Sequence, residues 1–132
     1  MTRRVDTEEG KNYLKKAEDA LHVAKIAIDE GAFDSSIMNS IHSAINALDF
    51  LAVTVLGKRA SGAHTDALLT VKSIFTTAEY SDLSKQFRSL MSKKNISEYE
   101  PDLMSKEEAE NCLKRAERIL DLVKQKIAET QI

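Results

Sequence analysis

Three polar side chains interrupt the apolar pattern of residues 35–56: His42, Asn46 and Asp49. Because a helix turns by about 100° per residue, these positions share one narrow sector beside the apolar stripe. An imidazole near a carboxylate can be held in one tautomer or kept charged, as a general base or a phosphate contact requires. The alternative is that the three side chains only complete hydrogen bonds at a helix–helix or subunit boundary.

A cation and a second imidazole follow in the next segment, where Arg59 and His64 form the pattern R-x4-H. A guanidinium fork and a titratable ring near a helix N-terminus form a suitable arrangement for binding an anion. In the alternative interpretation, the stem of Arg59 covers the end of a helical bundle and His64 caps the next helix. His22 is expected on a solvated surface of the first helix.

The stretch KKNISEY, residues 93–99, adds Lys94 and Tyr99 to the candidates. Cations at a helix end also complement the helix dipole, and a tyrosine can anchor in a core with its hydroxyl in water. The chain contains no H-x-x-x-H, C-x-x-C or glycine-rich phosphate motif, so we expect no metal site and no cofactor. The predicted ligand-binding residues are His42, Asn46, Asp49, Arg59, His64, Lys94 and Tyr99.

Apolar residues recur in steps of three and four along most of the chain, which predicts amphipathic helices. We expect these helices at about residues 8–30, 35–56, 64–77 and 80–94, and from about 105 onward, with a loop at 58–63. Gly31 and Gly57 are predicted helix stops, Asp34 or Ser35 a helix cap, and S-x-x-E at 105–108 a capping box. The sequence therefore predicts an all-α, antiparallel up-and-down bundle of four to five helices, with the first and last helices as neighbours.

A length of 132 residues fits one domain over residues 1–132. Four glycines and one proline leave few turn residues for a many-stranded sheet, which favours an all-α fold. The formal net charge of -2 gives no global positive field, although a local basic patch remains compatible with it. The single Cys112 cannot form an internal disulfide and is expected to pack as a small apolar residue. No apolar run reaches the length of a membrane span or a signal peptide, which predicts a cytoplasmic protein without membrane association.

Five ordered stretches resemble the HEPN family of helical domains. They are Y-L-x-x-A-x-x-A-L at 13–21, I-H-x-A-I-x-A-x-D at 41–49, G-x-R with A-H-T-D-A-L at 57–68, K-x-x-x-E-Y at 94–99, and A-x-x-x-L-x-x-A-E-R-x-L at 109–120. The resemblance implies an antiparallel helical bundle that commonly forms a homodimer. It also implies association with RNA, with nucleotides or with a nucleotidyltransferase partner protein.

The resemblance leaves catalysis open. Active HEPN ribonucleases carry R-x4-6-H on a later helix, often as R-N-x-x-x-H, where this chain has Lys94 and Tyr99 in place of Arg and His. Our leading hypothesis is a non-catalytic module that recognises a nucleotide, RNA or a nucleotidyltransferase-type partner at a polar cleft near the end of the second helix. The alternatives are a metal-independent endoribonuclease toxin of a toxin–antitoxin pair, with His42, His64 and Arg59 as catalytic candidates, and a purely structural protein-interaction module.

Overall fold

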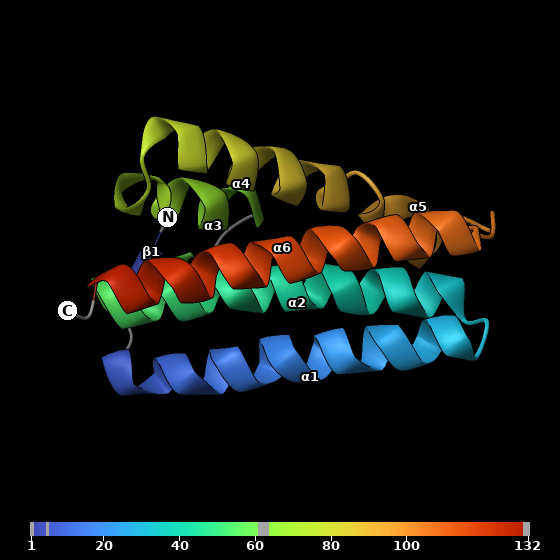
Figure 1. Ribbon diagram of the computed structural model, residues 1–132, viewed down its shortest axis with the longest axis horizontal. Coiled ribbons are helices and arrows are strands. Elements are labelled where there is room, and N and C mark those ends of the chain that lie inside the picture. The colour runs from blue at the N-terminus through green and yellow to red at the C-terminus, as the bar shows by residue number, and fades with distance from the viewer. Residues whose placement is uncertain (1, 5, 61–63, 131–132) are drawn as a thin grey trace.

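The computed structural model describes residues 2–4, 6–60 and 64–130, and the predicted all-α helical bundle is confirmed. Its elements are β1 (Thr2–Arg4), α1 (Gly10–Asp29), α2 (Phe33–Leu56), β2 (Lys58–Ala60), α3 (His64–Thr70), α4 (Thr77–Met91), α5 (Lys94–Tyr99) and α6 (Lys106–Thr130), with 3-10 turns at Thr7–Glu9 and Lys72–Ile74. The long helices lie roughly side by side (Figure 1). None of the helices in these ranges is long and apolar enough to cross a membrane.

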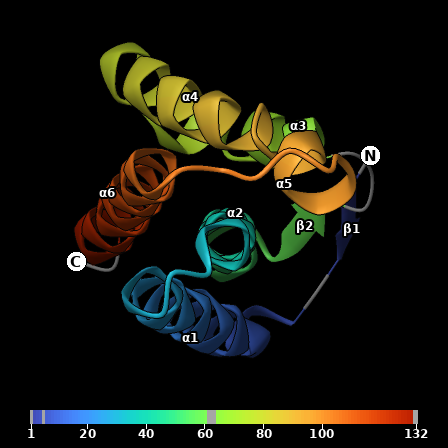
Figure 2. The ribbon, with the colours of Figure 1, turned by 90° about the vertical axis from the view of Figure 1, so that its right-hand side faces the viewer.

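Helix α2 occupies the centre of the bundle. Figure 2 shows α1 beneath it, α6 on its left, α4 above it, and α5 with the β1–β2 pair on its right. Both α1 and α6 pack mainly on α2 and also meet each other along one edge. The first and last helices are therefore neighbours as predicted, and the ion pairs Lys25–Glu117 and Glu18–Lys124 join them.

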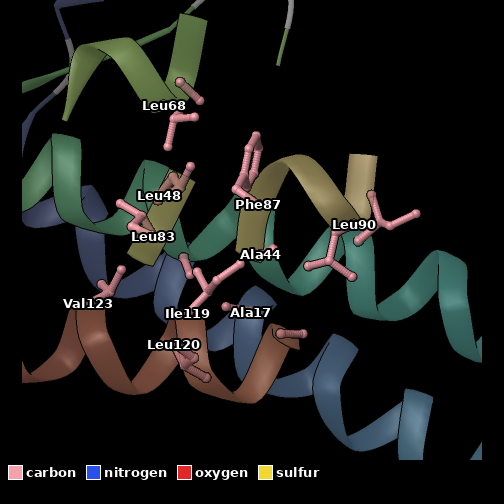
Figure 3. Close-up of a cluster of buried hydrophobic side chains, with 14 of the residues drawn as sticks. Ala17, Ala44, Leu48, Leu68, Leu83, Phe87, Leu90, Ile119, Leu120 and Val123 are labelled. Atoms are coloured by element: carbon pink, nitrogen blue, oxygen red, sulfur yellow. The ribbon is translucent and has the colours of Figure 1, made fainter. Parts of the chain in front are cut away.

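Side chains from α2, α4 and α6 form the centre of the core, where Leu48, Phe87 and Ile119 are fully buried (Figure 3). Full burial of one such side chain contributes about 1.5 to 3 kcal/mol. Cys112 lies in the same cluster at 3% exposure, so its predicted packing as an apolar residue is confirmed. Burial also raises the pKa of its thiol, which keeps the sulfur protonated.

The contact between α1 and α2 is built from small residues. Ala17 and Ala24 of α1 are fully buried, and they face serines of α2. The hydroxyl of Ser43 donates to the Ala17 carbonyl and that of Ser36 to the Ala24 carbonyl, each at 2.8 Å. Ser36 and Ser43 therefore combine close backbone approach with satisfied hydroxyl groups. The buried hydroxyl of Ser40 on the same helix has no hydrogen-bond partner among the described residues.

The helix ends agree only in part with the predictions. Gly31 and Gly57 adopt positive φ values of 77° and 67° just after α1 and α2, as predicted helix stops should. The Ser105–Glu108 capping box is present, with three hydrogen bonds of 3.1 Å. The predicted cap of α2 is wrong: the helix starts earlier, at Phe33, and the carboxylate of Asp34 instead accepts a hydrogen bond from the Met104 amide at 3.4 Å.

Two segments differ from their predicted structure. Residues 58–60, expected in a loop, form strand β2, which pairs antiparallel with β1 from the other end of the sequence. The expected helix at 64–77 stops at Thr70 and is followed by the 3-10 turn at Lys72–Ile74. Helix α4 then begins at Thr77, earlier than expected, with its own capping box between Thr76 and Glu79. The helix expected at 80–94 ends at Met91, and a separate helix that was not predicted, α5, begins at Lys94 and continues to Tyr99.

Candidate functional site

The side of α2 that faces away from α6 carries the three predicted polar residues. His42 is exposed, Asn46 is half-buried and Asp49 is buried at 7% exposure. The Asn46 amide donates to the backbone carbonyl of His42 at 2.8 Å, one turn earlier. His42 and Asp49 lie two turns apart, which is about 10 Å along the helix axis. The three residues therefore form a strip along α2 instead of meeting at one point.

At one end of this strip lies the Arg59 cluster, which we define as Tyr13, Asp49 and Arg59. The turn at Gly57 reverses the chain, so that β2 runs back beside α2 and carries Arg59 with it. The Nη1 atom of Arg59 lies 3.7 Å from the Asp49 carboxylate, and its guanidinium carbon lies 5.7 Å from the centre of the Tyr13 ring. Such a cation–π contact contributes about 0.5 to 2 kcal/mol.

Arg59 is held by these contacts but its donors are not saturated. The separation of 3.7 Å exceeds a good hydrogen bond, and the buried Nε atom has no hydrogen-bond partner among the described residues. The Asp49 carboxylate nevertheless compensates much of the positive charge of Arg59. The Arg59 cluster can therefore donate a hydrogen bond to an anion, but it does not present an unpaired cation.

At the other end of the strip lies the α5 cluster, which we define as His42, Lys94, Glu98 and Tyr99. Helix α5 packs across α2, with the hydroxyl of Ser97 3.2 Å from the sulfur of Met38, one turn before His42. The Lys94 ammonium donates to the Glu98 carboxylate at 2.7 Å and lies 5.6 Å from the centre of the Tyr99 ring. Tyr99 is 69% exposed, so the alternative that it anchors in the core is wrong.

The electrostatics of Glu98 link the members of the α5 cluster. The pKa of this carboxyl is lowered, chiefly by the hydrogen bond from Lys94, and further by hydrogen bonding with the Tyr99 side chain and by the positive charge of nearby His42. In turn, the hydrogen bond to Glu98 raises the pKa of Lys94. His42 therefore lies within electrostatic reach of a helix that follows it by some fifty residues in the sequence.

The seven predicted site residues thus fall into separate groups. The α5 cluster contains His42, Lys94 and Tyr99, the Arg59 cluster contains Asp49 and Arg59, and Asn46 lies between them on α2. His64 is the first residue of α3, and its side chain lies outside the described part of the structure.

Two residues of these clusters were not among the predictions. Glu98 could have been found from the sequence, because it stands four residues after Lys94, the spacing of a helical ion pair. Tyr13 gave no such signal, since its contact with Arg59 depends on how β2 returns past α1.

The side chains on this strip can make stacking contacts, hydrogen bonds and contacts between one cation and an anionic group. Within the described ranges, no three His, Cys, Asp or Glu side chains gather closely enough to hold a metal ion. Asp49 and Glu98, the carboxylates of the two clusters, each lie against a cation. The exposed ring of Tyr99 and the exposed imidazole of His42 are the groups most accessible to a ligand.

The sequence profile of the HEPN domain matches residues 11–126, a range that includes both clusters. The chain belongs to the HEPN family. A search of curated proteins found no significant match. HEPN domains include ribonucleases as well as non-catalytic modules that bind RNA or partner proteins. The matched range includes Lys94 and Tyr99, two of the predicted site residues in the α5 cluster.

Proposed function

We propose that this HEPN domain is a non-catalytic module that binds a nucleotide unit, either free or within single-stranded RNA, on the α5 cluster. The observation that carries the proposal is the exposed Tyr99 ring beside the Lys94 ammonium, on the side of α2 that carries His42. A nucleobase that stacks on an aromatic ring gains about 1 to 3 kcal/mol, and this contact tolerates any base. The adjacent Lys94 ammonium supplies a contact for a phosphate, and the exposed imidazole of His42 on α2 is a candidate for a second one.

The ion pair between Lys94 and Glu98 is compatible with such a ligand. Both side chains are partly exposed, and exposed ion pairs contribute only about 0 to 1 kcal/mol. A phosphate can therefore compete for Lys94 at small cost. The Glu98 carboxylate then serves as an acceptor for a ribose hydroxyl or a base amino group.

Binding is favoured over cleavage by the residue at position 99. A metal-independent ribonuclease needs a general base and a positioned cation that stabilises the charge developing on the phosphate. Here a tyrosine occupies the position where the ribonuclease pattern has histidine. This feature supports recognition of a nucleotide without turnover.

Fluorescence anisotropy with labelled octauridylate and labelled ATP tests this proposal. We expect Tyr99→Ala and Lys94→Gln each to weaken binding about tenfold, as the loss of a stacking or charge-assisted contact does. Tyr99→Phe keeps the ring and should retain affinity. Leu103→Ala is the matched control, because Leu103 is also apolar and highly exposed at 88% but lies outside the cluster. Equal affinity of Tyr99→Ala and Leu103→Ala would overturn the proposal.

The second candidate function is a metal-independent endoribonuclease toxin. The observation in its favour is that the exposed His42 lies within electrostatic reach of Glu98, the partner of Lys94. Pure protein that cleaves RNA in the presence of a chelator, and loses this activity in His42→Ala and His64→Ala, would establish it. Intact RNA after prolonged incubation with the wild type would exclude it under those conditions.

We also propose a homodimer, which the family resemblance implies. Helix α1 exposes two apolar side chains one turn apart, Val23 at 45% and Ile26 at 46%, and a partner would cover them. Sedimentation at micromolar concentration should then give the dimer mass, and only monomer would contradict it. A nucleotidyltransferase-type protein is the alternative partner, which co-purification with such a protein would reveal.

A further inference from the structure

Glu98 is the member of the α5 cluster best suited to distinguish one nucleobase from another. Stacking on Tyr99 accepts any base, because every base has an aromatic face, and Lys94 reaches a phosphate that all nucleotides share. An ionised carboxylate instead accepts hydrogen bonds at about four positions on its two oxygens and donates none. The hydrogen-bonding edges of the bases differ in the donors that they present to such an acceptor.

The Glu98 carboxylate lies close to the ring on which a base would stack. The Lys94 ammonium is 2.7 Å from Oε2 of Glu98 and 5.6 Å from the centre of the Tyr99 ring, so one ammonium contacts both groups. The Tyr99 residue is 69% exposed and the Glu98 side chain 32% exposed, which leaves both accessible to a ligand. A base that covers the ring can therefore turn one edge toward the carboxylate.

Glu98 is ionised at neutral pH and acts only as an acceptor. The hydrogen bond from Lys94 lowers the pKa of its carboxyl, and the nearby charge of His42 acts in the same direction. Lys94 donates to Oε2, and a carboxylate has about four acceptor positions, so others remain for a ligand.

Among the common bases, guanine matches this acceptor best. Its Watson–Crick edge presents two adjacent donors, N1–H and the 2-amino group, which fit the two oxygens of one carboxylate. Adenine and cytosine each present one amino group beside a ring nitrogen that accepts, and uracil places its N–H between two carbonyls. In these three bases, an acceptor would face the Glu98 carboxylate and be repelled by it.

A guanine nucleotide also keeps the charged groups of the cluster paired. When its phosphate draws Lys94 away from Glu98, the two guanine donors replace the ammonium at the carboxylate. A base without two adjacent donors leaves Glu98 with fewer partners, and sites with unpaired polar groups discriminate against such ligands. Because Glu98 is partly exposed, water replaces part of the lost bonding and the discrimination should be moderate.

We propose that the α5 cluster selects guanine, with Tyr99 as the stacking surface and Glu98 as the acceptor that specifies the base. The inference rests on the proposed function, because it needs a nucleotide unit stacked on Tyr99. Guanosine within single-stranded RNA and a free guanine nucleotide share this chemistry.

The experiment titrates the 15N-labelled full chain with guanosine, inosine and adenosine monophosphates and obtains dissociation constants from the amide shifts. The inosine nucleotide keeps N1–H but lacks the 2-amino group. Octauridylate and the same octamer with one central guanosine present the base within RNA. Glu98→Gln removes the carboxylate, and Glu100→Gln is the matched control, because Glu100 is an exposed acid outside the cluster. Tyr99→Ala reports separately on stacking, and circular dichroism checks that each variant is folded.

We expect the wild type to bind the guanosine nucleotide about tenfold more tightly than the adenosine nucleotide, with the inosine nucleotide between them. Glu98→Gln should bring the three affinities within about twofold of each other, whereas Glu100→Gln should keep the wild-type ratio. Both acid variants remove a negative charge near the phosphate, so the ratio of affinities carries the test. A preference among the mononucleotides identifies the free nucleotide as a sufficient ligand, and one between the octamers alone identifies RNA.

Equal affinities of the wild type for all three mononucleotides and for both octamers would overturn the inference, as would a guanine preference that Glu98→Gln retains. If Tyr99→Ala weakens binding but the wild type shows no base preference, the proposed function stands and this inference fails. If Glu98→Gln removes a guanine preference while Tyr99→Ala changes nothing, selection by Glu98 stands and stacking on Tyr99 fails. Absence of binding by every probe would overturn both.

Discussion

The two sides of α2 contrast sharply although they share one continuous helix. Ile41 and His42 are adjacent in sequence, yet Ile41 is fully buried among core side chains while His42 is exposed. On the α1 side, the Ser43 hydroxyl donates to the Ala17 carbonyl, whereas on the outer side Asp49 and Glu98 lie against cations. Packing determines which residues occupy the inner side of α2, which faces α1 and the core. The outer side of α2, which carries His42 and Asn46, leaves side chains accessible to a ligand.

The largest expected effect is on the free energy of unfolding, and it should differ between two neighbouring residues on opposite sides of α2. Ile41→Ala removes a fully buried side chain from the core, so we expect the free energy of unfolding to fall by about 2 to 5 kcal/mol. His42→Ala should change it by no more than about 0.5 kcal/mol, as exposed substitutions do. Urea unfolding of both variants makes the comparison. A loss in His42→Ala as large as that in Ile41→Ala would show that the outer side is also structural.

A smaller effect compares polar residues on the two sides. Ser43→Ala removes a buried hydroxyl that donates to the Ala17 carbonyl at 2.8 Å, so we expect a loss of about 1 kcal/mol in stability. Asn46→Ala removes only a local bond to the His42 carbonyl and introduces a better helix former. Its stability should therefore match or slightly exceed that of the wild type. Thermal unfolding of the two variants distinguishes the buried from the accessible polar group.

The smallest effect concerns two ion pairs and the response to acid. Lys126, which is buried at 9% exposure, donates to Glu79 across α4 and α6 and lowers the pKa of that carboxyl below its usual value near 4.5. Lys94 lowers the pKa of Glu98 in the same way within α5. Since both carboxyls bind protons more readily in the unfolded chain, their stabilisation is present above pH 4.5 and is lost as the pH falls through the lowered values.

Urea unfolding at a series of pH values from 6 down to 3 checks this prediction. The acid-induced loss of stability should be smaller in Glu79→Gln than in the wild type, and Glu98→Gln should differ less, because its pair lies within one short helix. Identical pH profiles of wild type and Glu79→Gln would show that the link between α4 and α6 does not contribute.

The helical bundle follows from the sequence because its cause is local. Apolar steps of three and four residues, the glycine stops at 31 and 57 and the Ser105–Glu108 box each act within a few residues. The same periodicity placed His42, Asn46 and Asp49 on one side of α2. It could not show which other segments meet them, because that depends on packing between distant parts of the chain.

The remaining parts of the site depend on such distant contacts. Helix α5 has only six residues, too few for apolar periodicity to reveal it, and its position is set by Ser97 and Ile96 packing toward α2. Strand β2 pairs with β1, more than fifty residues earlier in the sequence, so neither strand carries a local signal. The exposure of Tyr99 follows from the position of α5 and could not be predicted from its neighbours.

The central claim is that the outer side of α2, with α5, binds a nucleotide unit. Chemical-shift mapping tests it most directly, by recording amide spectra of the 15N-labelled chain during titration with octauridylate. We predict saturable shifts concentrated at residues 38–46 and 94–99, with little change at His22 and Asp121, which lie together where α1 meets α6. Shifts confined to the α1–α6 side, or no shifts at saturating ligand, would contradict the claim.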